Sequence, residues 1–136
     1  MLSEPRTETG ATSALLRTIG AVALLVIGAV HLEQYFAVHF DVVPVIGPLF
    51  VLNFAGATLI AVGLLIPSAR MRLMHVLLAL AGIGLAGTSF VFLFVSEHQP
   101  LFGFQDHGYR AAIVIALAAE AAAVLLLGGY LAARRR

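Results

Sequence analysis

The stretch that decides the fold is Ala111-Ala-Ile-Val-Ile-Ala-Leu-Ala-Ala-Glu-Ala-Ala-Ala-Val-Leu-Leu-Leu-Gly-Gly-Tyr-Leu-Ala-Ala133, which is apolar around one carboxylate, Glu120. A helix of about 20 apolar residues is long enough to cross a bilayer. An ionisable group in the middle of such a helix is costly, so it usually faces the protein interior and has a partner there. The stretch therefore predicts a membrane-spanning helix whose Glu120 points toward other helices.

The composition of the whole chain extends this prediction to a membrane protein of one domain. Apolar residues make up 61% of the 136 residues and charged residues only 11%, whereas a soluble domain carries about 25% charged residues. We expect an all-α, four-transmembrane-helix bundle over residues 13–136, after a flexible cytoplasmic tail over residues 1–12. The expected spans are residues 13–32, 43–66, 73–95 and 111–133.

Residue usage excludes several classes of function. The chain has no cysteine, which rules out disulfides, thiolate metal sites and a cysteine nucleophile. Its net charge is +1, so it offers no basic surface for nucleic acid. Ser96 and His98 are close in sequence but lack a third, orienting group, and no catalytic residue is predicted. We therefore expect no enzymatic activity and no cofactor.

The arginines predict the orientation of the helices in the membrane. Seven of the eight lie at or near the same end of the four expected spans, and only Arg110 lies at the other end. Cytoplasmic segments carry the excess of positive charge in membrane proteins. We expect a multi-pass protein of the cytoplasmic (plasma) membrane with both termini in the cytoplasm. The seven arginines are Arg6, Arg17, Arg70, Arg72, Arg134, Arg135 and Arg136.

Polar residues in three of the spans lie at a similar depth. Glu120, Asn53, Thr88 and Ser89 each lie six to nine residues from the outer end of their span, which is roughly 9 to 14 Å at 1.5 Å per residue. Glu120 shares a helical face with alanines, as Asn53 and Thr88 do with glycine and alanine, and small residues mark close helix contacts in membranes. The pattern predicts a buried cluster of Glu120, Asn53 and Thr88.

Such a cluster has three interpretations. In the first, a neutral Glu120 is hydrogen-bonded to the Asn53 amide and fixes the last helix against the second. In the second, Glu120 is a proton- or cation-coupled carboxylate that lines a small cavity. In the third, Glu120 is buried only against a second protomer. No basic residue lies at the same depth, which favours the neutral form.

The histidines suggest a second candidate site, at the outer face. His31, His39, His98 and His107 are expected there beside carboxylates, and imidazole with carboxylate suits zinc, copper or iron. Their spacing matches no established metal signature, however, and a polar rim is the simpler interpretation. Bis-histidine haem ligation by His31 and His98 would need a large pocket. His31, Tyr35, His98 and Arg110 remain candidates for binding at the outer face, with an ion pair to Asp106 as the alternative for Arg110.

Two sequence elements resemble a group of small actinobacterial four-helix integral membrane proteins. They are Ile46-Gly-Pro-Leu-Phe-Val-Leu-Asn53, which follows His31, and Leu101-Phe-Gly-Phe-Gln-Asp106. The group carries Ile-Pro-x-Ile-Gly-x-Leu-Phe-x-Leu-Asn, a Leu-Phe-Gly-Phe-Gln/Glu loop and a glutamate in the last helix; this chain departs in having Val43 at the start of the first element. The resemblance, over residues 25–125, implies a four-helix fold and supplies no activity.

Size and topology are also similar to those of the DoxX-like membrane proteins. The small multidrug transporters have four helices and one membrane carboxylate too, but in them the glutamate lies in the first helix and here it lies in the fourth. A direct match with these transporters is therefore not expected.

The expected function is that of a non-enzymatic integral membrane protein. It would act as an accessory or scaffold subunit, or as a small lipophile-binding protein. One alternative is an oligomeric proton-coupled transporter of small molecules or ions that uses Glu120. Another is a metal- or haem-binding redox protein that uses the outer histidines. The expected partners are the lipid bilayer and either further copies of the chain or the other subunits of a membrane complex.

Overall fold

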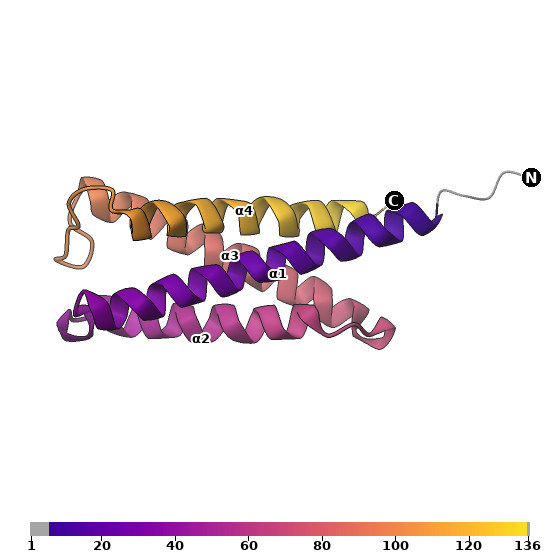
Figure 1. The fold of residues 1–136 in the computed structure, drawn as a ribbon, viewed down its shortest axis with the longest axis horizontal. Coiled ribbons are helices and arrows are strands. Elements are labelled where there is room, and N and C mark those ends of the chain that lie inside the picture. The colour runs from indigo at the N-terminus through magenta and orange to yellow at the C-terminus, as the bar shows by residue number, and fades with distance from the viewer. Residues whose placement is uncertain (1–5, 136) are drawn as a thin grey trace, which may run out of the picture.

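The computed structural model describes residues 6–135, and these form the four long helices labelled in Figure 1. The long helices are α1 (Arg6–Ala37), α2 (Ile46–Leu65), α3 (Arg72–His98) and α4 (Ala111–Ala133), and the short 3-10 turns are η1 (Phe40–Val42) and η2 (Ala69–Met71). All four long helices are apolar and long enough to cross a membrane. The predicted all-helical fold with four helices that could span a membrane is confirmed for the described residues.

The helix boundaries agree with the prediction for α4 and differ most for α1. This helix begins at Arg6 and ends at Ala37, so it includes residues 6–12 of the expected tail and five residues beyond the expected end at 32. No proline interrupts residues 6–37, and proline is the residue that most strongly breaks a helix. Residues 1–5 of the expected tail, and Arg136, lie outside the described residues.

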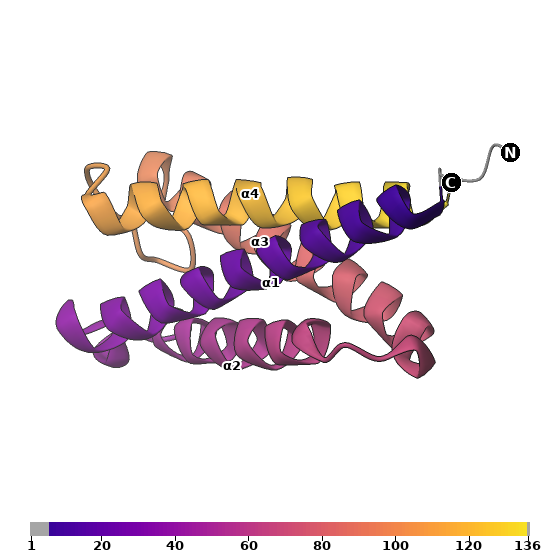
Figure 2. The same ribbon diagram turned by 45° about the vertical axis from the view of Figure 1, so that its right-hand side comes forward.

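The chain runs up and down, and α1 and α3 cross between α2 and α4. Figures 1 and 2 show α1 passing from beside α4 at its start to beside α2 at its end, while α3 runs on the opposite diagonal. The start of α1, the α2–α3 connection and the end of α4 therefore share one end of the bundle, here called the arginine end. The α1–α2 and α3–α4 connections share the other, here called the loop end.

Small residues bring the helices together in the core. A Cβ atom added at Gly82 of α3 would lie 2.8 Å from Leu127 and 3.0 Å from Leu24, both fully buried. A Cβ at Gly20 of α1 would lie 2.6 Å from Leu127. Glycine at these positions lets the backbones approach closely, as is typical of membrane helices. On α2, a Cβ at Gly63 would lie 2.6 Å from Leu78, which places α2 and α3 in close contact near the arginine end.

Polar contacts also join the helices at the arginine end. Nη1 of Arg17 lies 2.9 Å from Nδ1 of the buried His75, whose Nε2 lies 3.0 Å from the Ile66 carbonyl oxygen. Just after α4, Nη1 of Arg134 donates a 2.9 Å hydrogen bond to the Arg72 carbonyl oxygen at the start of α3. These contacts link α1, α2 and α4 to α3 at this end.

Candidate functional site

A pocket of about 450 Å³ lies between α2 and α3, in the half of the bundle nearer the loop end. Its walls are largely apolar, and three polar side chains, His31, Asn53 and Ser89, form what we call the polar patch. The pocket exists because α3 lies beside α4 at the loop end and leaves α2 there (Figure 2). The lining residues are His31, Phe40, Ile46, Leu49, Phe50, Leu52, Asn53, Gly84, Leu85, Thr88, Ser89, Phe92, Leu93, Ser96, Leu101, Phe104 and Asp106.

Glu120 lies behind the polar patch and is fully buried, which confirms the predicted position of its side chain in the protein interior. Its neighbours on the buried face of α4 include Ala116 and Ala123. The Ser89 hydroxyl donates a 2.5 Å hydrogen bond to Oε1 of Glu120, and the Asn53 amide donates a 3.0 Å hydrogen bond to Oγ of Ser89. Ser89 therefore joins three helices through one oxygen atom.

This geometry corrects two details of the predicted cluster. The Asn53 amide reaches Glu120 through Ser89 and not by a direct hydrogen bond. Thr88 is exposed, as are Gly84 and Ala81 of the face on which it was expected to pack, and Thr88 and Gly84 line the pocket. Neighbouring positions on a helix differ by about 100° in direction, since a turn holds 3.6 residues, so a rotation by one residue puts Ser89 in place of Thr88.

The sequence contains a pattern that predicts Ser89, and not Thr88, on the packed face of α3. Small or polar residues follow one another along this face at spacings of four, three, four and three residues, from His75 to Ser89. Spacings of three and four residues mark one face of a helix. The buried residues are His75, Ala79, Gly82, Ala86 and Ser96.

His31 is the candidate residue whose surroundings the sequence did not predict. It was expected at the outer face near His98, and it is 7% exposed and belongs to the polar patch. Its Nε2 lies 3.3 Å from Oγ of Ser89, and its Nδ1 donates a 2.9 Å hydrogen bond to the Ile27 carbonyl oxygen. The signal was its spacing from Leu24 and Ile27, seven and four residues earlier, which puts all three on the buried face of α1.

Aromatic rings form the loop-end wall of the pocket. Phe50 lies between His31 and Phe40, with ring centroids 4.9 Å and 4.8 Å away. Phe104, from the α3–α4 connection, packs edge-on against Phe40 at 5.3 Å. A tight turn holds Phe104 in place, because Leu101 and Phe104 exchange two backbone hydrogen bonds across it. The pocket thus has flat apolar surfaces beside its polar patch.

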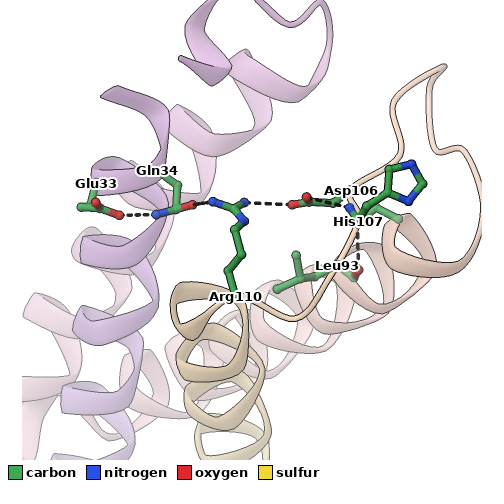
Figure 3. Close-up of polar contacts among 7 residues, drawn as sticks. Glu33, Gln34, Leu93, Asp106, His107 and Arg110 are labelled. Carbon is green, nitrogen blue, oxygen red and sulfur yellow. Dashed lines mark hydrogen bonds and ion pairs between the residues drawn. The ribbon is translucent and has the colours of Figure 1, made fainter. Parts of the chain in front are cut away.

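Arg110 organises the loop-end rim of the pocket (Figure 3). It forms a 3.0 Å ion pair with Asp106, which confirms the predicted pair, and donates a 2.9 Å hydrogen bond to Oε1 of Gln34. Gln34 in turn donates to Glu33. The backbone N–H of Asp106 bonds to the Ser96 carbonyl oxygen at 3.0 Å. These contacts fasten the α3–α4 connection to α1 and α3.

The other predicted outer-face residues lie apart from the pocket lining. His98 is exposed and bonds to the Phe94 carbonyl oxygen at 2.7 Å, and His39 and His107 are also exposed. Tyr35 is half-buried and packs edge-on against the Phe36 ring. Within residues 6–135 no three histidine or carboxylate side chains come together as metal ligands would.

Comparisons with known protein families, with curated proteins and with solved structures found no match. The resemblance to small actinobacterial membrane proteins therefore stays a prediction.

Proposed function

We propose that this protein is a non-enzymatic integral membrane protein of the cell membrane that binds one small, neutral lipophile in the pocket between α2 and α3. The observation that carries the proposal is an apolar pocket of about 450 Å³ with three hydrogen-bonding side chains at one place in its wall. Ligand pockets have volumes of roughly 300 to 1,000 Å³ and combine apolar walls with a few polar groups that orient the ligand.

The position of the pocket supports entry from the bilayer. Leu52 of α2 is 65% exposed, and Gly84 and Thr88 of α3 are exposed too. All three line the pocket and belong to helices that are apolar enough to span a membrane. The open side of the pocket therefore faces the region that lipid chains would occupy, so a lipophile would reach it without crossing water.

The charges around the pocket support a neutral ligand. Asp106 is the only lining residue with a carboxylate, and its ion pair with Arg110 compensates its charge. In the polar patch, the Asn53 amide keeps hydrogen-bonding capacity, because its oxygen has no hydrogen-bond partner among residues 6–135. This oxygen would accept a hydrogen bond from a hydroxyl head group, and the aromatic wall beside it would pack against the apolar part of the ligand.

Filling the pocket from Gly84 will test the proposal. A Cβ atom at Gly84 meets nothing within 4 Å, so the Gly84→Leu side chain extends into the pocket without displacing the helix. We expect photolabelling by a long-chain alcohol that carries a diazirine to fall about tenfold, which corresponds to roughly 1.4 kcal/mol of binding free energy. Labelling is measured in detergent-purified protein, and the labelled peptides are identified by mass spectrometry.

Gly87 offers the matched control, because it is on the same helix, also has nothing within 4 Å of an added Cβ, and does not line the pocket. The Gly87→Leu variant should be labelled like the wild type. Equal labelling of the Gly84→Leu and wild-type proteins, or labelled peptides that exclude the pocket, would rule out the proposed site.

We further propose that the arginine end faces the cytoplasm, which the predominance of arginine there supports. The chain has no cysteine, so single cysteines can report the side of the membrane. Ala69 lies at the arginine end, His107 lies at the loop end, and both are exposed. In intact cells a membrane-impermeant maleimide should label the His107→Cys variant and should label Ala69→Cys only after lysis. The reverse pattern would overturn this orientation.

A further inference from the structure

The Ser89 hydroxyl is surrounded by three polar partners. The Asn53 amide nitrogen lies 3.0 Å from Oγ, Oε1 of Glu120 lies 2.5 Å from it, and Nε2 of His31 lies 3.3 Å from it. A hydroxyl has one hydrogen to donate and two lone pairs that accept. The three partners therefore use all the hydrogen bonds that the hydroxyl can make, so one partner must accept its hydrogen and two must donate to its lone pairs.

Chemistry fixes the direction of two hydrogen bonds, one made by Ser89 and one made by His31. The Asn53 NH2 group can only donate, so it occupies one lone pair of Ser89. The Ile27 carbonyl oxygen can only accept, so Nδ1 of His31 carries a hydrogen. One lone pair and one hydrogen of Ser89 then remain for Glu120 and Nε2 of His31. One of these two groups must donate to Ser89, and the other must accept from it.

Two arrangements satisfy this count with the same atoms. In the first, Glu120 is a carboxylic acid that donates to Ser89, and Ser89 donates to the bare Nε2 of a neutral His31. In the second, Nε2 of an imidazolium donates to Ser89, and Ser89 donates to the Glu120 carboxylate. Moving the acid hydrogen from Glu120 to Ser89, and the hydroxyl hydrogen from Ser89 to Nε2, converts the first into the second and leaves the number of protons unchanged.

We infer that Glu120, Ser89 and His31 form a proton relay, which carries one proton between the buried carboxyl group and the imidazole that lines the pocket. The relay goes beyond lipophile binding and does not depend on it, because both ring nitrogens of His31 bond within the protein, Nε2 to Ser89 and Nδ1 to the Ile27 carbonyl oxygen.

Within the part of the chain that the structure describes, no other titratable group around His31 is placed to replace Glu120. Asp106 and Arg110 line a small cavity on another side of His31, but they are paired with each other at 3.0 Å. The α2 residues that contact or neighbour the ring, Phe50 and Asn53, do not titrate. Among the hydrogen bonds of residues 6–135, the one through Ser89 is the route from His31 to a carboxyl group.

Nitrogen NMR of the His31 ring will test the relay in detergent-solubilised, full-length protein labelled with heavy nitrogen at histidine, near neutral pH. In the wild type we expect the Nε2 resonance between the values of a protonated and a bare ring nitrogen, because the two arrangements exchange. In Ser89→Ala the route is broken, and the resonance should move to the bare value. Ser89→Thr restores the hydroxyl and should restore the wild-type position.

Two further variants complete the test. Glu120→Gln has no proton to transfer and should give the bare value, while Thr88→Ala removes the neighbouring hydroxyl outside the relay and should change nothing. An Nε2 resonance that is the same in the wild type, Ser89→Ala and Glu120→Gln overturns the relay, as does a Ser89→Thr variant that behaves like Ser89→Ala. If Glu120→Gln fails to fold, the alanine and threonine variants of Ser89 decide alone. No lipophile is added, so failure of the relay and failure of ligand binding are seen separately.

Discussion

The Gly47→Ala variant is expected to lose about 3 kcal/mol of unfolding free energy, as overpacked sites do when the neighbouring atoms cannot move aside. A Cβ atom at Gly47 would lie 2.5 Å from the Phe40 carbonyl oxygen and 3.3 Å from that of Asp41. Both are backbone atoms, so no side-chain rotation relieves the contact. The unfolding free energy is measured in mixed detergent micelles by far-ultraviolet circular dichroism.

The same substitution is expected to reduce ligand binding. Phe40 stacks on Phe50 and packs against Phe104 in the aromatic wall of the pocket. Displacement of the Phe40 backbone would therefore open that wall. Gly87→Ala is the control, because its Cβ meets no atom within 4 Å, it does not line the pocket, and replacement of a helical glycine stabilises by about 0.5 to 1 kcal/mol. A Gly47→Ala protein as stable as Gly87→Ala would show that the loop end adapts to the added methyl group.

The second large effect is expected for Glu120→Ala, which should lower the unfolding free energy by about 3 kcal/mol through a buried cavity and an unpaired hydroxyl. Glu120 is fully buried, and its carboxyl group is the acceptor for Ser89 on the neighbouring helix. Truncation removes side-chain volume between α3 and α4 and one partner of Ser89. The same denaturation experiment measures the loss.

Glu120→Gln separates the structural role of this residue from its proton. The amide has nearly the shape of the carboxylic acid, and its NH2 group can donate to Ser89 as the acid does, so we expect a stability within about 1 kcal/mol of the wild type. Its proton-transfer function should nevertheless be lost. If Glu120→Ala were as stable as Glu120→Gln, the carboxyl group would not hold α4 in place, and the interpretation of Glu120 as a helix lock would be wrong.

The sequence predicted those features that depend on one helix at a time. The bounds of α4 and the burial of Glu120 follow from an apolar run with a single carboxylate, because the membrane sets the length of the helix and the cost of exposing the charge to lipid. The ion pair of Arg110 and Asp106 was also predictable, since the two residues are four positions apart. These features could be predicted because each depends on residues that are close to one another along the chain.

Features that depend on how the helices rotate and cross were not predictable in the same way. Thr88 and Ser89 are adjacent polar residues at the same depth, so depth does not distinguish them; the distinction lies in the spacing of Ser89 from the buried Gly82 and Ala86 on the packed face of α3. His31 was assigned to the outer face because the expected helix ended at residue 32, whereas α1 continues to Ala37. The pocket itself follows from the divergence of α2 and α3, for which no residue pattern in either helix is specific.

Close contact between Gly63 and Leu78 holds α2 against α3 near the arginine end, whereas the two helices diverge toward the loop end. From Leu65 to Ile46 the helix is about 28 Å long at 1.5 Å per residue. A tilt of α2 about this contact would move the loop end of the helix the most, and the pocket lies in that half of the bundle. The hydrogen bond between Asn53 of α2 and Ser89 of α3 lies between the two ends of α2 and opposes such a tilt. The size of the pocket therefore depends on the angle between α2 and α3, and the hydrogen bond between Asn53 and Ser89 is one of the contacts that fix this angle.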